Sequence, residues 1–159
     1  MVYISLLAAV LLAAIDQIIK YFVVIYLKPV STVVAIPYIL DLTYVENRGV
    51  AFGMFEDSRW IFVALTSIVI TIFIVLLFKM GKSSHLFSVA SVLIVGGGIG
   101  NLIDRLIYGY VVDYLRLSFF PPVCNFADYC ITAGTVLLIL YLLFYSDKNN
   151  SDKLSRKES

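Results

Sequence analysis

Asp113 and Asp128 are the two residues of this chain best suited to carry out chemistry. Asp113 follows a tyrosine-rich segment, Asp128 stands near the start of a long apolar stretch, and a Pro-Pro turn between them can fold one toward the other. Two close carboxylates cannot both ionise cheaply, so one keeps a proton at neutral pH. An acid then lies beside a base, which is what hydrolysis of an amide bond by activated water requires.

Both aspartates also have a structural interpretation. Asn125 is of a type preferred at helix N-caps, and an acidic residue three positions later suits the positive end of a helix dipole. Asn125 and Asp128 could therefore simply begin a helix, and Asp113 could be a solvated carboxylate in a loop. The spacing of these residues does not decide between the two interpretations.

The composition is that of an integral membrane protein with one compact domain. Of the 159 residues, 61% are hydrophobic and only 14% are charged, whereas a soluble domain usually carries about a quarter charged residues. The net charge of +1 gives no indication of a nucleic-acid partner. His85, Cys124 and Cys130 do not form a recognised zinc-binding spacing. A disulfide between the two cysteines stays open, although Cys130 also fits as a small apolar packing residue.

Four apolar segments predict an all-α membrane protein with four transmembrane helices, at residues 2–27, 61–78, 86–103 and 129–145. Each is long enough to cross the hydrocarbon core, where backbone groups cannot stay unpaired. Lys79 and Lys82 lie between the second and third segments, and four basic residues follow the last. Because basic flanks stay inside the cell, we expect both termini to be cytoplasmic and loops 28–59 and 105–126 to be external.

The outer loops are predicted to be structured. Their β-branched and aromatic residues predict strands at 32–36, 38–45 and 114–120, which would form a small β-element. Residues 47–55, which contain Gly49 and Gly53, predict a short helix on the membrane surface. The polar residues 146–159 predict a disordered cytoplasmic tail.

Polar residues recur inside the apolar segments at a spacing of four. Asp16 and Lys20 share a helix face and can pair, which lowers the cost of about 2.5–3.5 kcal/mol for a lone charge at the bilayer centre. This pair either orients its helix or supports the aspartates. Asn101 and Arg105, with Asp104 between them, predict the wall of a polar pocket, although Arg105 could instead extend to lipid headgroups.

A run of glycines precedes Asn101, at positions 96, 97, 98 and 100. Gly96 and Gly100 have the G-x-x-x-G spacing that lets two membrane helices approach closely. A phosphate-binding loop would need a strand directly before the glycines and a Gly-Lys-Ser/Thr directly after them, and the sequence has neither at those places. We therefore interpret the glycines as a packing surface.

Five short motifs together resemble those of lipoprotein signal peptidase, the bacterial type II signal peptidase. They are D-Q-x-x-K at 16–20, E-N-R-G-V-A-F-G at 46–53, G-N-L-I-D-R at 100–105, V-V-D-Y at 111–114 and N-F-A-D at 125–128. Each motif is weak alone, but the ordered set is specific and extends over nearly the whole chain except the polar tail. The one departure is Tyr114, where Phe is commoner in the family.

The resemblance implies a membrane aspartic endopeptidase of the bacterial cell membrane, with residues 1–145 as the peptidase domain. Asp113 and Asp128 would be the catalytic pair. Its substrate would be a prolipoprotein that already carries diacylglycerol on a cysteine, cut on the amino side of that cysteine. The enzyme would work among membrane lipids as a monomer, without metal or organic cofactor. The residues that would position substrate and support the pair are Asn47, Gly49, Asn101, Arg105, Asn125, Asp16 and Lys20.

Two other classes of membrane protein compete with this interpretation. A small ion channel or proton-coupled transporter would explain intramembrane Asp16 and Lys20, but it predicts polar residues along several spans, and residues 61–78 carry only three hydroxyl side chains. A membrane scaffold would leave the aspartate pair without a purpose. A serine peptidase is disfavoured because the sequence contains no G-x-S-x-G motif.

Overall fold

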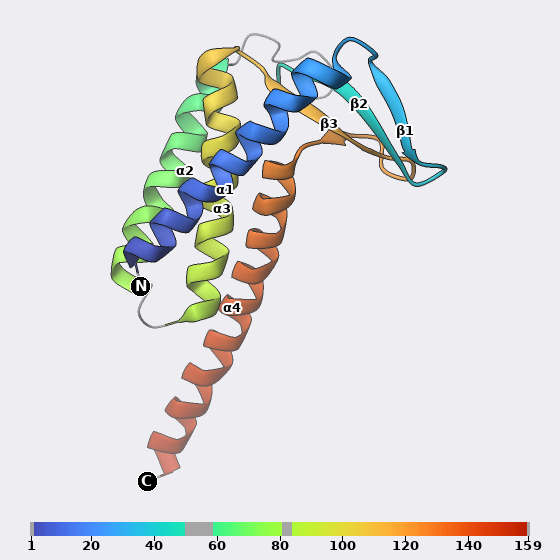
Figure 1. Cartoon of the computed structure of the whole chain (residues 1–159). Coiled ribbons are helices and arrows are strands. Elements are labelled where there is room, and N and C mark those ends of the chain that lie inside the picture. The colour runs from blue at the N-terminus through green and yellow to red at the C-terminus, as the bar shows by residue number, and fades with distance from the viewer. Residues whose placement is uncertain (1, 50–58, 81–83, 159) are drawn as a thin grey trace.

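The computed structural model describes residues 2–49, 59–80 and 84–158, with side chains to Phe144. Within these residues, four helices are long and apolar enough to cross a membrane, as predicted (Figure 1). The first is α1 (Val2–Phe22), which continues as a π-helical segment, η1 (Val23–Leu27); the others are α2 (Arg59–Met80), α3 (His85–Ile107) and α4 (Phe126–Glu158).

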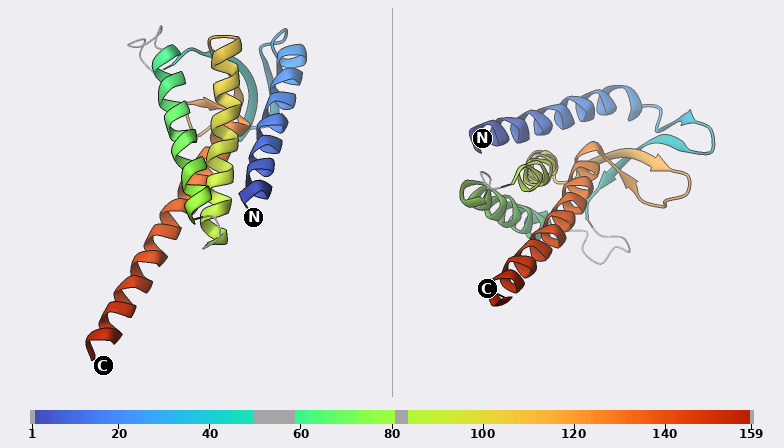
Figure 2. Two further views of the ribbon diagram at one scale, coloured as in Figure 1. Left: turned by 90° about the vertical axis from the view of Figure 1, so that its left-hand side faces the viewer. Right: turned by 90° about the horizontal axis from the view of Figure 1, so that it is seen from below.

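Helix α3 lies at the centre of the bundle, with α1, α2 and α4 around it (Figure 2). More than half of the membrane-length window of α3 is buried, compared with about a tenth for α2, whose buried side chains are Ile70 and Leu77. Exposed side chains on α1, α2 and α4 are mostly large and apolar, as lipid contact requires. The central helix is therefore the element on which polar groups can be shielded from lipid.

Two glycines of α3 allow its neighbours to approach closely, as the packing interpretation predicted. A Cβ atom added at Gly97 would lie 2.5 Å from the backbone oxygen of Ala127 in α4. At Gly100 it would lie 2.5 Å from Asp16 Oδ2 in α1. These two glycines thus bring the first turn of α4 and the polar side chain of α1 against the same end of α3.

A four-stranded antiparallel sheet extends sideways from that end of the bundle (Figure 1). Its strands, in the order β1-β2-β3-β4, are β1 (Thr32–Ile36), β2 (Leu40–Asn47), β3 (Val111–Leu117) and β4 (Val123–Cys124). The predicted pair of strands near residues 32–45 is confirmed. Pairing of β2 with β3 places Val45 opposite Asp113 and Asn47 opposite Val111, so both loops contribute to one surface.

The third strand begins three residues earlier than predicted and ends three residues sooner. Val111 to Tyr114 are all buried, so the strand lacks the alternation of apolar and polar residues that marks a half-exposed strand. It ends at Leu117, whose carbonyl accepts a hydrogen bond from the backbone N–H of Phe120 in a turn. The two-residue strand β4 was not predicted, because so short a segment carries no periodic pattern.

Three other predictions have different outcomes. The prediction of a disordered tail is wrong, because α4 continues to Glu158. No Gly or Pro follows Gly134 to interrupt the helix. Cys124 and Cys130 are free thiols, and Cys130 is buried. The predicted surface helix at residues 47–55 falls largely on residues 50–58, which lie outside the described part of the chain.

Candidate active site

Asn125 connects the two aspartates through three of its atoms. Its side-chain amide donates a hydrogen bond to Asp113 Oδ1 at 2.6 Å, while its backbone N–H donates to Asp128 Oδ2 at 3.1 Å. Its side-chain oxygen accepts from the backbone N–H of Asp128 at 3.0 Å. The residue thereby caps α4, as the structural interpretation proposed, and also brings Asp113 of β3 to the first turn of α4.

Asn47 holds the other oxygen of Asp113. Its side-chain amide donates to Asp113 Oδ2 at 2.8 Å, and its own side-chain oxygen accepts the backbone N–H of Gly49 at 3.1 Å. Gly49 has a φ of 128°, a conformation that side-chain-bearing residues rarely adopt. The tight turn after β2 therefore requires glycine, and it orients the Asn47 amide toward Asp113.

Asn101 holds the remaining oxygen of the pair. Its side-chain amide donates to Asp128 Oδ1 at 2.8 Å, and its side-chain oxygen accepts from Lys20 Nζ at 2.9 Å. Each of the four carboxylate oxygens of Asp113 and Asp128 thus accepts one hydrogen bond from a protein donor. A carboxylate oxygen has a second lone pair, so each one can still bind a proton, a water molecule or a substrate group.

The two carboxylates differ in their surroundings. Asp113 is 1% exposed, whereas Asp128 is half-buried. Burial raises the pKa of Asp113 from its ordinary value of 3.8 to about 6, with a further upward contribution from the charge of Asp128 and downward contributions from the Asn47 and Asn125 hydrogen bonds. A carboxyl group with a pKa near 6 can exchange protons close to neutral pH.

A buried lysine connects the backbone segments that carry both aspartates. Lys20 Nζ lies 2.8 Å from Asp16 Oδ2 and 2.9 Å from Asp104 Oδ2, and all three side chains are almost fully buried. Asp16 Oδ1 accepts the backbone N–H of Ala127, the residue before Asp128. Asp104 Oδ2 accepts the backbone N–H of Val112, the residue before Asp113. The predicted Asp16–Lys20 pair is confirmed, and we call these three residues the lysine brace.

Asp104, Gln17 and Tyr114 are part of this arrangement, although the sequence analysis assigned no site role to Gln17 or Tyr114 and expected Asp104 only in the wall of a polar pocket. Gln17 donates to Asp104 Oδ1 at 2.9 Å, and the Tyr114 hydroxyl accepts the backbone N–H of Phe126 at 3.2 Å. All three belong to the motifs that were recognised. The sequence feature that indicates Asp104 as a neighbour of Asn101 is their spacing of three, which places both on one face of the helix.

Arg105 contacts neither aspartate by a described hydrogen bond or ion pair. Its guanidinium lies over the Phe62 ring at 5.3 Å and donates to the Asn101 backbone oxygen at 3.3 Å. The side chain is half-buried, and its guanidinium interacts electrostatically with the carboxylates of Asp128 and Asp113. The structure therefore places Arg105 beside the pair, and a role in substrate positioning stays a prediction.

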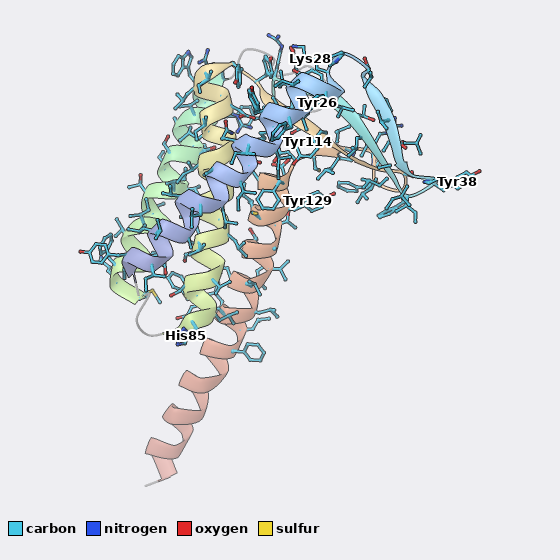
Figure 3. The ribbon with its side chains drawn as sticks, viewed as in Figure 1. Tyr26, Lys28, Tyr38, His85, Tyr114 and Tyr129 are labelled. Carbon is cyan, nitrogen blue, oxygen red and sulfur yellow. The ribbon has the colours of Figure 1, made fainter. Side chains whose placement is uncertain are left out.

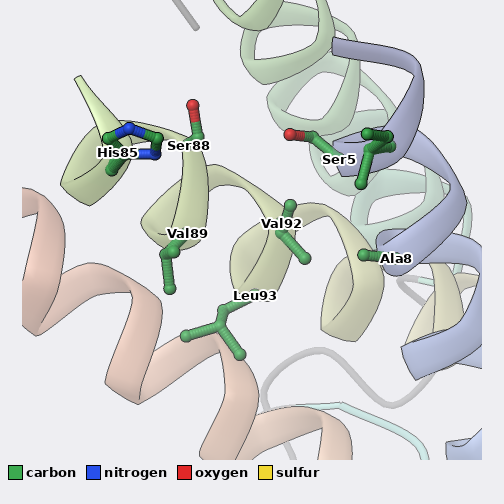
Figure 4. Close-up of a pocket in the computed structure, with 8 residues that line it drawn as sticks. Ser5, Ala8, His85, Ser88, Val89, Val92 and Leu93 are labelled. Atoms are coloured by element: carbon green, nitrogen blue, oxygen red, sulfur yellow. The ribbon is translucent and has the colours of Figure 1, made fainter. Parts of the chain in front are cut away.

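A cavity of about 320 Å³ lies at the other end of the bundle, between the N-terminal parts of α1 and α3 (Figure 4). Its lining is mainly aliphatic, with three polar side chains, Ser5, His85 and Ser88, and without a carboxylate. The cavity is therefore separate from the aspartates. The buried charged groups of the described residues instead gather at the end that carries the sheet, as Asp16, Lys20, Asp104 and Asp113.

The fold defines a multi-pass membrane protein in which the buried charged groups of the described residues converge at one end of a four-helix bundle. Residues 8–144 match the family model described as signal peptidase (SPase) II. The chain belongs to this family of membrane peptidases, and the resemblance noted from its motifs is confirmed.

Curated relatives and solved structures agree with this assignment. The lipoprotein signal peptidase of Halothermothrix orenii is 42% identical over 142 residues, covering 89% of this chain and 94% of the relative. That of Clostridioides difficile is 39% identical, covering 91% and 97%. A bacterial membrane enzyme solved by the in meso method at 2.3 Å superposes with a TM-score of 0.82 at 31% identity, covering 91% of this chain and 90% of that chain.

Proposed function

We propose that this peptidase is an aspartic endopeptidase in which Asp113 and Asp128 activate water. It removes the signal peptide from prolipoproteins that carry diacylglycerol on a cysteine, and it cuts on the amino side of that cysteine. The observation that best supports the proposal is the shared contact of Asn125 with both carboxylates, at 2.6 Å and 3.1 Å. That contact ties both carboxyl groups to one residue, as an acid–base pair would require.

The reaction needs the pair to hold one proton. The ionised carboxylate takes a proton from water as the water oxygen attacks the scissile carbonyl, and the protonated carboxyl delivers its proton to the leaving amine. The pKa of about 6 at buried Asp113 supports such sharing near neutral pH. Because the two groups interact, their protons titrate as a pair.

The hydrogen-bond donors around the aspartate pair stabilise the tetrahedral oxyanion. Arg105 is the candidate with a full positive charge, and its position over Phe62 beside Asn101 leaves it near both carboxylates. A donor fixed before the reaction and partly shielded from water stabilises developing charge more strongly than water does. Asn47 and Asn125 keep the pair in position, and Gly49 orients Asn47.

The location of the pair fits a lipid-anchored substrate. Asp113 belongs to the sheet, and Asp128 lies in the first turn of the fourth membrane-length helix. A diacylglyceryl group must remain among lipid acyl chains, so a bond next to the modified cysteine stays close to the membrane surface. We place this end at the outer face of the bacterial cell membrane, with both termini cytoplasmic. The link after α2 and the tail are rich in basic residues, whereas the basic residues of loops 28–59 and 105–126 are interspersed with acidic ones.

The test compares two forms of one precursor with the purified full chain in detergent. One form carries diacylglycerol on the lipobox cysteine, and the other is the same polypeptide without the modification. We expect cleavage of the lipidated form alone, with mass spectrometry placing the modified cysteine at the new N-terminus. Equal cleavage of both forms, or a cut elsewhere, would contradict the proposed specificity.

A further inference from the structure

The far end of the sheet presents large apolar side chains that no described part of the protein covers. We call it the sheet tip and define it as residues 36–40, which contain the β1–β2 turn, and residues 117–120, which follow β3. Tyr38 is 95% exposed and Phe119 is 76% exposed, with Ile36, Ile39 and Phe120 about half exposed. None of these nine residues is charged. An apolar surface of this kind on a monomer marks contact with a partner or a membrane.

The two parts of the sheet tip are fixed to each other by backbone hydrogen bonds. The N–H of Ser118 donates to the carbonyl oxygen of Ile39 at 3.0 Å, and the N–H of Ile39 donates to that of Ile36 at 3.1 Å. The tip is therefore one ordered unit in which the exposed aromatic residues of two loops lie together.

Tyr38 has a left-handed backbone conformation that tyrosine rarely adopts. Its φ is 64°, in the left-handed region, and it follows Pro37 in a turn where Gly or Asn is usually found. A bulky side chain in this region is unusual. An exposed tyrosine in a position that disfavours it indicates that its side chain has a use outside the fold. Tyrosine is a common residue at the boundary between lipid and water, since its ring is apolar and its hydroxyl is polar.

Charge is distributed unevenly along the sheet. At the end nearest α1, Lys28 and Arg48 surround Glu46. Asp41 and Arg116 face each other one step before the tip, and beyond them the tip is uncharged. The sheet therefore changes from charged to apolar along its length, as an element that enters a membrane surface obliquely would.

The slope of the sheet directs this apolar end toward the membrane-spanning part of the molecule. The strands leave the end of the bundle sideways and slope down to about the level at which α4 begins (Figure 1). Tyr38 lies at about the same level of the molecule as Tyr129 of α4 (Figure 3), and Tyr129 belongs to the candidate span Phe126–Phe144. The sheet tip is thus level with a residue of this candidate span, so a bilayer that surrounds the start of the span would also reach the tip.

We propose that the sheet tip inserts into the leaflet beside α4 and anchors the sheet in the membrane through Tyr38 and Phe119. The partner is the lipid bilayer itself, and the contact is with glycerol backbones and upper acyl chains. Elements that lie in this interface bury their apolar side about 5–10 Å into the boundary between headgroups and acyl chains. The anchor fixes the depth and tilt of strands β2 and β3, and it does not depend on the proposed chemistry.

The test uses tryptophan fluorescence of the full chain in lipid nanodiscs that hold one copy each. Trp60 is the only tryptophan, so Trp60→Phe provides a background without indole. Tyr38→Trp and Phe119→Trp each place one indole at the tip, on different loops. Thr32→Trp is the matched control, because Thr32 is exposed at the other end of the same strand β1. Phospholipids brominated in the upper acyl chain quench from the membrane, and iodide quenches from water.

We expect the indoles at positions 38 and 119 to be quenched several-fold more by bromolipids than the control, which iodide should quench instead. Quenching of both tip positions by iodide, as in the control, would overturn the proposal, since the tip would then lie in water. Protection from both quenchers would also overturn it, because protein and not lipid would cover the tip. Reporters on two loops keep the test valid if one substitution disturbs the turn.

Discussion

Asn125 and Asp128 exchange two hydrogen bonds across the first turn of α4, from Asn125 N to Asp128 Oδ2 at 3.1 Å and from Asp128 N to Asn125 Oδ1 at 3.0 Å. This reciprocal pattern satisfies two backbone donors that a helix start leaves unpaired. It leaves the Asn125 amide free to donate to Asp113. The capping and catalytic interpretations of Asn125 are therefore compatible, because different atoms of the residue serve each one.

Substitutions at Asn125 should separate these two roles. Asn125→Ser keeps an oxygen that can cap the helix but removes the donor to Asp113, so we expect near-normal thermal stability and a large loss of turnover. Asn125→Ala removes both and should also cost about 1 kcal/mol of unfolding free energy. Thermal unfolding in detergent and cleavage of a lipidated precursor measure the two effects. Full activity of the serine variant would exclude a role for the Asn125 amide in the reaction.

The pH dependence of cleavage should respond to Asn47. Its hydrogen bond lowers the pKa of Asp113, which burial raises to about 6, so removing the donor in Asn47→Ala should raise that pKa further. A hydrogen bond to a charged group contributes about 1.5–3 kcal/mol, and one pH unit corresponds to about 1.4 kcal/mol. We therefore expect the limb of the kcat/KM profile near pH 6 to move up by about one to two units. An unchanged profile with reduced kcat would mean that Asn47 does not act through Asp113.

The same pKa shift has a consequence for stability. Because folded Asp113 holds its proton more tightly than the unfolded chain, it favours the folded state at low pH. Its contribution should be lost as the pH rises from about 4 to about 6, so the unfolding free energy should fall over this range. Asp113→Asn, which does not titrate, serves as the control and should lack this component.

Substitutions of two lysines should show how much burial matters to an ion pair. Lys20 is 3% exposed between Asp16 and Asp104, while Lys28 is 46% exposed beside Glu46. Lys20→Met leaves buried carboxylates without a cation and should cost about 3–5 kcal/mol of unfolding free energy. Lys28→Met should lower the unfolding free energy far less, because water screens an exposed ion pair. Equal melting temperatures for the two variants would contradict the assignment of Lys20 as the centre of the brace.

The helices could be predicted from the sequence because lipid imposes a simple requirement. A span of about 20 apolar residues has few alternatives to a helix, so all four were found, although Phe126 lies three residues before the predicted start of the fourth. The helical tail was missed because the prediction relied on polarity. Polarity does not exclude a helix in a segment without Gly or Pro that continues an existing one.

The site was predictable in its residues but not in its connections. The family resemblance implied that Asn47, Asn101 and Asn125 lie near the aspartates, but it could not show which carboxylate oxygen each amide contacts. Those contacts depend on the β2–β3 register and on the approach of α4 to Gly97. Asp104 was predicted only as part of the pocket wall, because its contact with the backbone N–H of Val112 in β3 is long-range and helix spacing does not indicate it.

The proposed orientation predicts opposite labelling of two positions in intact cells. In a background with Cys124→Ser and Cys130→Ala, we expect Thr32→Cys in the first loop to react with an impermeant maleimide and Ser155→Cys in the tail to stay unlabelled. The physical reason is the retention of Lys and Arg flanks on the cytoplasmic side. Disrupted cells, in which both positions should react, provide the control. Labelling of the tail in intact cells would reverse the orientation.

The central claim is that Asp113 and Asp128 together perform the cleavage. Its most direct measurement is turnover of a lipidated precursor by Asp113→Asn, Asp128→Asn and the control Asp41→Asn, each purified in detergent and checked for unfolding temperature. Asn keeps the size of Asp but cannot act as a base or carry the exchangeable proton, so both pair variants should lose cleavage while remaining folded. Asp41, which pairs in register with Arg116 on the same sheet, should tolerate the change with near-normal turnover. Substantial cleavage by either folded pair variant would contradict the account.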